Sequence, residues 1–347
     1  MGTLSLTDYE EVKIPVPWGH ISGRWHGNRT ERPILAIHGW LDNLGTFDRL
    51  IPLLPDCVGL LCIDLPGHGR SSRLKPGLHY SVHDYVFIIP RVMKEYGWQK
   101  VSLMGHSLGG IIAFVYAALA PHTVDMIISL DILRPLPSDP RGKDVGNFSS
   151  FLEKHLVEDE RQAVGNMREP PAYTLPELRK VLAKGSYNSV PPKDAQHLLY
   201  RQVAKSQLYP DRFYFSRDAR VKYYYHMYMD DGFAAELARR IKRKPYLILK
   251  GSESPFLGPH CDEPMSILRQ NNPHFEFHVV EGTHHAHLHN PEECAKHIVP
   301  FIRHHRPPNL TSWSLAGKEA QLSSKERRRA QEQFFARSKQ SKQRSKL

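Results

Sequence analysis

Residues 101–112 read Val-Ser-Leu-Met-Gly-His-Ser-Leu-Gly-Gly-Ile-Ile, an apolar run that leads into a G-x-S-x-G turn and then into a helix-like segment. This order of strand, turn and helix predicts that Ser107 sits on a sharp, strained turn. Glycines at positions 105 and 109 leave room for the neighbouring strand and helix. The Ser107 hydroxyl is thereby presented at a helix N-terminus as a candidate nucleophile.

Strand-like and helix-like segments alternate on both sides of this turn. The apolar runs are Pro33–Ile37, Gly59–Ile63, Val101–Met104, Met126–Leu130, Tyr246–Leu249 and Phe275–Val280, and the helical segments are Phe47–Leu54, Val82–Tyr96 and Gly110–Leu119. Two further runs, Val12–Pro17 and Ile21–Trp25, predict an opening hairpin. Repeated strand-helix units predict an α/β fold with a mostly parallel sheet and helices on both faces.

A long segment interrupts this alternation and divides the chain. Residues 133–240 contain Pro-rich turns and charged amphipathic pieces, and they are too many for a plain loop. We interpret them as a helical lid inserted into a core of residues 1–132 and 241–305. The aromatic cluster Tyr223–Tyr228 lies in this lid and either lines a pocket or packs the lid onto the core. Residues 306–347 form a basic extension.

The net charge of +11 is concentrated in that extension. Residues 318–347 hold ten Lys or Arg against three Glu, so the remaining chain carries only +4. Such a body gives no reason to expect a surface that follows nucleic-acid phosphates. The apolar runs are too short to span a membrane, and the N-terminus lacks the features of a signal peptide. The four cysteines show no C-x-x-C spacing, so they suggest neither a zinc site nor a disulfide framework.

The sequence ends in Ser345-Lys346-Leu347, preceded by a Lys- and Arg-rich segment. This tripeptide has the form of a peroxisomal targeting signal that an import receptor reads. We therefore expect a peroxisomal location with that receptor as a partner. The alternatives are a chance match in a Lys- and Ser-rich tail and a cytoplasmic location.

Four motifs follow successive strands in one order along the chain. They are His38-Gly39-Trp40, the segment Asp64–Ser72 with the pattern D-x-P-G-H-G-x-S, the serine turn, and a stretch from Gly282-Thr283-His284 to Pro291-Glu292. In this combination the chain resembles the α/β-hydrolase superfamily. In detail it is similar to serine hydrolase-like proteins, which lie near lidded epoxide hydrolases and haloalkane dehalogenases. The resemblance covers about residues 10–305.

The resemblance implies a general base from a group of four histidines, namely His284, His285, His287 and His289. The family pattern places its base seven residues before the proline of a Pro-Glu pair, which selects His284. The group could instead hold a metal, but it lacks interspersed Asp or Cys ligands at a recognisable spacing. The resemblance also implies that the backbone N–H groups of Leu108 and Trp40 stabilise an oxyanion. The ring of Trp40 either walls the acyl pocket or only packs.

The acid of the expected triad departs from the common family pattern. Most relatives have an aspartate three residues after the glycine that closes the strand ending here at Gly251, and this chain has Ser254 there. Some lidded relatives instead carry the acid after the strand that follows the nucleophile helix, where this chain has Asp131. We favour Asp131, with Glu253 as the alternative acid. Asp131 could also merely cap the first turn of the lid.

A serine nucleophile argues against reactions that pass through an ester on an enzyme carboxylate. The expected reaction is hydrolysis of an ester, thioester or related acyl bond through an acyl-serine intermediate, on a small-molecule acyl substrate. It requires no metal and no organic cofactor. The alternative hypothesis is a weakly active or inactive hydrolase scaffold that acts as a binding protein, because the acid is missing from its usual position.

Overall fold

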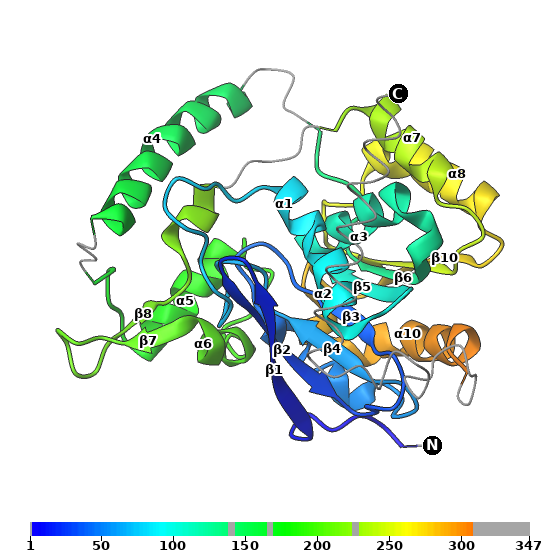
Figure 1. Cartoon of the computed structure of the whole chain (residues 1–347), viewed down its shortest axis with the longest axis horizontal. Helices are drawn as coiled ribbons and strands as arrows, with labels where there is room; N and C mark the ends of the chain where they lie inside the picture. The colour runs from blue at the N-terminus through cyan, green and yellow to red at the C-terminus, as the bar shows by residue number, and fades with distance from the viewer. Residues whose placement is uncertain (1, 138–142, 165–168, 224–228, 308–347) are drawn as a thin grey trace, which may run out of the picture.

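The computed structural model describes residues 2–137, 143–164, 169–223 and 229–307, and its centre is an eight-stranded sheet (Figure 1). The strands lie in the order β1-β2-β4-β3-β5-β6-β9-β10. Their bounds are Tyr9–Val16 (β1), Gly19–His26 (β2), Ile34–Ile37 (β3), Leu60–Ile63 (β4), Val101–His106 (β5), Val124–Leu130 (β6), Tyr246–Gly251 (β9) and Phe275–Val280 (β10). Only the pairs β1/β2 and β2/β4 are antiparallel in this sheet. The predicted hairpin and mostly parallel sheet are confirmed.

The central strands are short and apolar because both of their faces are covered. All four residues of β3 are buried, and alternate residues belong to different cores. Leu35 and Ile37 pack into one hydrophobic cluster, and Ile34 and Ala36 pack into the other. This alternation is the period of two that a strand imposes on its side chains. The carboxyl ends of the parallel strands therefore meet at one edge, where the loops that follow them converge.

Helices cover the two faces of the sheet in two separate layers. One layer contains α1 (Val82–Val86), α2 (Ile88–Tyr96), α3 (Leu108–Leu119), α7 (Asp231–Arg240) and α8 (Asp262–Asn271). The other contains α10 (Pro291–His305), the short α9 (Ala286–His289) and the 3-10 turns η1 (Leu44–Phe47) and η2 (Ile51–Leu53). Two further 3-10 turns are η3 (Pro121–Thr123) and η5 (Pro259–Cys261).

Two predicted helices are interrupted, and a proline accounts for each interruption. The segment Phe47–Leu54 contains Pro52 and forms the last residue of η1 and all of η2 instead of an α-helix. The segment Val82–Tyr96 contains Pro90 and is divided into α1 and α2 at Phe87. Proline lacks the N–H that donates to the residue four positions earlier, which favours a break near each of these two prolines.

The insertion between β6 and β9 differs from the predicted lid in its secondary structure and in its C-terminal boundary. It contains α4 (Lys143–Ala163), α5 (Leu175–Gly185), α6 (Gln196–Gln202), the strand pair β7 (Val203–Lys205) and β8 (Phe213–Phe215), and η4 (Ala219–Tyr223). It is therefore not purely helical. Helix α7 was predicted to belong to the lid, but its buried face joins the core beside α8, on the opposite side of the molecule from α4 (Figure 1).

A buried ion pair attaches the insertion to the core. The Nε atom of Arg201 in α6 lies 2.6 Å from Oδ2 of Asp64, and both side chains are fully buried. Asp64 follows β4 and also accepts hydrogen bonds at 2.9 Å from the N–H groups of Leu44 and Arg70. Arg201 in addition donates to Glu11 on β1 at 3.0 Å. The aspartate of the D-x-P-G-H-G-x-S motif thus organises the loop after β4 and anchors α6.

Within the described ranges, no helix combines the length and the apolar character needed to cross a membrane. The predicted targeting signal Ser345-Lys346-Leu347 and residues 224–228 of the predicted aromatic cluster lie outside these ranges.

Candidate active site

Ser107 occupies the turn between β5 and α3 in a backbone conformation that is rare for a residue with a side chain. Its φ is +50° and its ψ is −118°. The two flanking glycines are required by close backbone contacts: a Cβ on Gly105 would lie 2.3 Å from the Gly109 backbone, and a Cβ on Gly109 would lie 2.0 Å from the Ile37 carbonyl oxygen. The strained turn is therefore held by packing on both sides, which is typical of a functional site.

The two predicted oxyanion residues lie at the start of α3 and in the loop after β3. Leu108 is the first residue of α3, and the first N–H groups of a helix have no acceptor within the helix. Trp40 is partly buried against the core, and its ring Nε1 donates to the Val221 carbonyl at 2.7 Å. The ring therefore packs, and it also links the loop after β3 to η4 of the insertion.

The structure brings His284 and Asp131 together. Nδ1 of His284 lies 2.6 Å from Oδ2 of Asp131, although the residues are 153 positions apart. Asp131 directly follows β6 with a φ of +57°, and His284 lies in the loop after β10. Because Asp131 is an acceptor when ionised, His284 must carry its proton on Nδ1, which leaves Nε2 as the basic nitrogen.

Asp131 also accepts hydrogen bonds from the end of β9 and from Ser254, which stands where relatives were expected to carry the acid. The N–H of Gly251 donates to Oδ1 at 2.8 Å, and the hydroxyl of Ser254 donates to Oδ2. The two positions at which family members carry the acid, 131 and 254, therefore lie side by side. Here the first is an aspartate, and the second is a serine that donates a hydrogen bond to it. The side chain of Glu253 is exposed, and the ring of His284 is directed to Asp131 instead.

His284 is also fixed against the serine turn. Nε2 of His106, the residue before Ser107, donates to the His284 carbonyl oxygen at 3.0 Å, and the two rings are 4.7 Å apart. The ring of Phe256 lies 4.0 Å from the His284 ring on another side. Burial lowers the pKa of His284 below 6.5, although the bond to Asp131 opposes this shift. The imidazole is therefore neutral at pH 7, as a base must be.

A buried hydrogen-bond network surrounds these residues, and sequence reasoning missed its acid, Asp42. Oδ2 of Asp42 lies 3.2 Å from Nε2 of His285 and 3.2 Å from Nδ1 of His106, the latter outside hydrogen-bond alignment. Burial raises the pKa of Asp42, but the two histidines outweigh it and hold this pKa well below its usual range. No motif marks Asp42, whose only signal is its place two residues after Trp40.

The four histidines considered as a metal site bind four different partners. His284 binds Asp131 and His285 binds Asp42. Nε2 of His287 lies 2.9 Å from the hydroxyl of Thr46, and Nε2 of His289 accepts the Thr283 N–H at 3.1 Å. Their nitrogens therefore stabilise the loop after β10 instead of converging on one point. His285 also contacts the insertion, since its Nδ1 lies 2.7 Å from the Ser189 hydroxyl.

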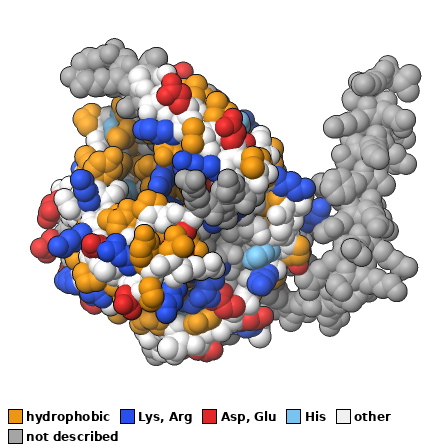
Figure 2. Space-filling view, turned by 90° about the vertical axis from the view of Figure 1, so that its left-hand side faces the viewer, with side chains coloured by type: hydrophobic (Ala, Val, Ile, Leu, Met, Phe, Trp, Pro, Cys, Tyr) orange, Lys and Arg blue, Asp and Glu red, His pale blue; other side chains and the backbone are white. Residues whose placement is uncertain are grey.

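A cavity of about 240 Å³ lies between α4, η4 and the loop before α1. Its lining is mostly apolar and consists of His79, Phe148, Phe151, Leu152, His155, Leu156 and Tyr223. Tyr223, from the predicted aromatic cluster, thus lines a pocket. Figure 2 shows the side of the molecule that carries the insertion, where hydrophobic side chains are exposed among Lys and Arg; Leu152 and Leu156 of α4 are among the exposed apolar residues.

The sheet order, the serine turn and the loops after β6 and β10 define the class of protein. Residues 32–291 match the family described as alpha/beta hydrolase fold, and the chain belongs to this family.

Individual relatives agree with this assignment. The chain is 33% identical over 309 residues to a Drosophila melanogaster protein named "Probable serine hydrolase", covering 86% of this chain and 89% of the relative. It is 31% identical over 307 residues to "Serine hydrolase-like protein" of Danio rerio, covering 88% and 91%. Among solved structures, "Thioesterase Domain From Curacin Biosynthetic Pathway" matches with a TM-score of 0.68 at 21% identity, covering 85% of this chain and all of that one. The last likeness concerns the fold alone.

Proposed function

We propose that this protein is a serine hydrolase that cleaves an ester, thioester or related acyl bond through an acyl-serine intermediate. The observation that carries the proposal is the 2.6 Å contact between His284 Nδ1 and Asp131 Oδ2, on a loop bonded to the residue before Ser107. A serine on a strained turn, an oriented imidazole and a buried carboxylate are the parts that acyl transfer requires.

In the proposed reaction His284 accepts the proton of the Ser107 hydroxyl as the oxygen attacks the carbonyl carbon of the substrate. The N–H groups of Leu108 and Trp40 stabilise the negative charge that develops on the carbonyl oxygen. His284 then gives its proton to the leaving oxygen or sulfur, and the bond to the acyl carbon breaks. Water then attacks the acyl-serine while His284 accepts its proton; the bond between the acyl carbon and the Ser107 oxygen breaks, His284 returns the proton to that oxygen, and the carboxylic acid leaves. Asp131 holds the imidazole in one tautomer throughout.

The cavity beside α4 supports an acyl substrate with an apolar portion. No Lys, Arg, Asp or Glu is among its lining residues, so the cavity suits an apolar group better than an ionic one. The same 3-10 turn, η4, contributes Tyr223 to this cavity and holds the ring of Trp40 through the Val221 carbonyl. We therefore place the apolar part of the substrate in this cavity.

Labelling with a fluorophosphonate ester tests the proposal, because this reagent forms a covalent bond with activated serines. We expect labelling of the natural chain and of Ser149→Ala, whose exposed serine lies on α4, and none of Ser107→Ala. If the folded natural chain is not labelled, Ser107 is not an activated nucleophile and the proposal is overturned in favour of an inactive hydrolase scaffold. If Ser107→Ala is still labelled, the nucleophile is another residue.

A further inference from the structure

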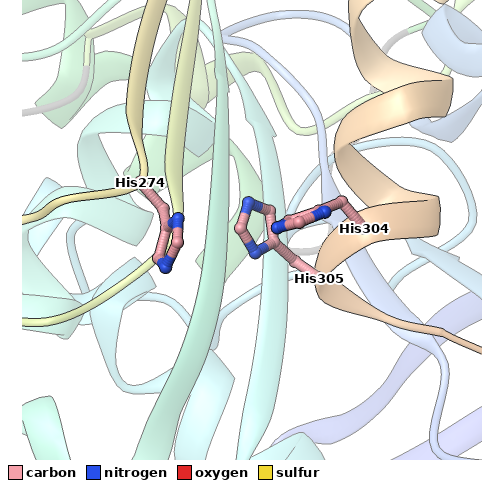
Figure 3. Close-up of side chains that lie close together, drawn as sticks. All are labelled: His274, His304 and His305. Atoms are coloured by element: carbon pink, nitrogen blue, oxygen red, sulfur yellow. The ribbon is translucent and has the colours of Figure 1, made fainter.

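Three imidazoles gather on the seam between α10 and β10. His304 and His305 form the end of α10, and His274 is the residue directly before β10. Figure 3 shows the ring of His274 facing the other two from the opposite side of a gap. His274 and His304 are exposed and His305 is half-buried. None of these residues takes part in the proposed catalytic network.

The geometry of the three rings suits a single small cation. One nitrogen from each ring can be chosen so that all three lie within 4.8 Å of one another. The ring centre of His305 lies 5.0 Å from the ring centre of His274 and 4.6 Å from that of His304. Zinc binds imidazole nitrogens at about 2.0–2.1 Å in a tetrahedral arrangement, which places its ligands about 3.4 Å apart. Small side-chain rotations of the exposed His274 and His304 would bring the three nitrogens from within 4.8 Å of one another to the spacing that zinc requires.

The backbone that carries these histidines is held on both sides of the gap. The carbonyl oxygen of His274 accepts the N–H of Tyr246 at 3.2 Å, so its backbone belongs to the sheet. Arg306, directly after His305, is buried and donates to the Ser102 hydroxyl at 2.7 Å. The ring of Phe301 packs 4.5 Å from the ring of His305. The backbone positions are therefore fixed in advance, which favours binding.

We propose that His274, His304 and His305 bind one transition-metal cation of the zinc class, each through one imidazole nitrogen. Imidazole ligands suit zinc, copper, nickel and cobalt, whereas magnesium and calcium require oxygen ligands. Because the cluster is exposed, water completes the coordination.

This site is more accessible than the second group of potential ligands among the described residues. Asp42, His106 and His285 also lie within 4.8 Å of one another, but all three are buried. Nε2 of His106 donates to the His284 carbonyl, and Nε2 of His285 binds Asp42. A metal there would have to replace the bond between His285 and Asp42 inside the core, whereas His274 faces solvent.

The proposed ion would have a structural role. His274 precedes β10 and the His284 loop follows it, so the six-residue strand separates the two sites by about 20 Å. The ion would join the end of α10 to the start of β10 and stabilise the folded chain by mass action. The site is therefore independent of the proposed hydrolysis, and its test uses no activity measurement.

Calorimetric titration of the full chain without a polyhistidine tag tests this proposal, with zinc chloride as the probe. We expect His274→Ala and His305→Ala each to weaken zinc binding by about 100-fold or more, since loss of an outer-shell partner alone costs about 10- to 100-fold. At a zinc concentration 100-fold above the dissociation constant, the melting temperature of the natural chain should rise by about 4 °C. Neither variant should show this rise.

His297→Ala is the matched control, because His297 stacks on His278 at 4.1 Å on the same seam but is not part of the cluster. Zinc binding and the thermal shift should be unchanged in this variant. Cobalt should give the visible absorption of a nitrogen-bound tetrahedral ion in the natural chain and in His297→Ala, and not in His274→Ala. Equal zinc affinity in the natural chain and His274→Ala, with both folded by circular dichroism, would overturn the proposal.

Discussion

Asp131 gives the imidazole of His284 a carboxylate partner in a chain that has a serine at the usual position of the acid. Its carboxylate accepts bonds from His284, from the Gly251 N–H and from Ser254. Ser254 stands where relatives were expected to carry the acid, and here it donates to that acid instead. The departure from the family pattern therefore leaves the imidazole with a carboxylate partner.

The first prediction separates the two acids considered from the sequence. Asp131→Asn should lower kcat by about 10⁴-fold, because the amide no longer holds His284 in the productive tautomer. Glu253→Gln should leave kcat unchanged, because Glu253 is exposed. Steady-state hydrolysis of an activated ester measures both. The assignment is wrong if Glu253→Gln loses activity and Asp131→Asn keeps it.

The second prediction concerns pH. Burial lowers the pKa of His284 below 6.5, and only the neutral imidazole can accept the serine proton. Activity should therefore fall as the pH drops through this lowered pKa, with a midpoint below pH 6.5. The pH profile of kcat/KM measures the midpoint, with Glu253→Gln as a control that should not move it. A midpoint above pH 6.5 would contradict the predicted direction.

At the scale of elements, the attachment of α6 to the core rests on the Arg201–Asp64 pair. Arg201→Met leaves the charge of Asp64 buried without its cation, so it should lower the free energy of unfolding by about 3–5 kcal/mol. The matched control is Arg239→Met, whose pair with Glu236 is exposed and should contribute about 0–1 kcal/mol. Urea denaturation measures both changes. Equal effects in the two variants would show that the buried pair does not anchor α6.

Helix α4 is expected to set the size of the apolar part of the substrate. Phe151→Trp enlarges a side chain that lines the cavity, so kcat/KM for long acyl esters should fall relative to short ones. A series of p-nitrophenyl esters measures this ratio. Phe233→Trp, an exposed change on α7, is the control. An unchanged ratio in Phe151→Trp would place the acyl group elsewhere.

The elements that sequence reasoning could predict are those with a local signature. The serine turn is marked by glycines whose positions tolerate no side chain, and the central strands are marked by runs buried on both faces. The breaks at Pro52 and Pro90 were also encoded locally, but the apolar pattern around them continues and favours a helix. The boundary of the insertion was misplaced because α7 has the same amphipathic pattern whether it covers a lid or a core.

At the scale of the whole molecule, long-range neighbours escaped prediction. Asp42 meets His285 across 243 positions, and no motif relates them. His274 meets His304 and His305 only because α10 lies along β10. Asp131 and His284 are 153 positions apart, yet they were predicted, because a family resemblance supplied the pairing that spacing alone does not.

The last prediction concerns location, which remains a proposal. Where Ser345-Lys346-Leu347 ends the chain, deletion of Leu347 should disperse a fluorescent N-terminal fusion from peroxisomes into the cytoplasm, because the import receptor reads the terminal tripeptide. Microscopy with a peroxisomal marker measures the distribution. Deletion of residues 308–317 serves as a control that keeps the tripeptide. The same distribution with and without Leu347 would rule out the signal.

The contact of Ser189 with the loop after β10 has a practical consequence. Ser189 meets His285 through its hydroxyl, and its carbonyl accepts the Thr283 hydroxyl at 2.9 Å, so the insertion braces the residues on both sides of His284. A minimal enzyme made by cutting out the insertion would lose more than its substrate cover. The residues next to His284 would lose their contacts with Ser189, and we expect such a trimmed protein to be a poor starting point for engineering.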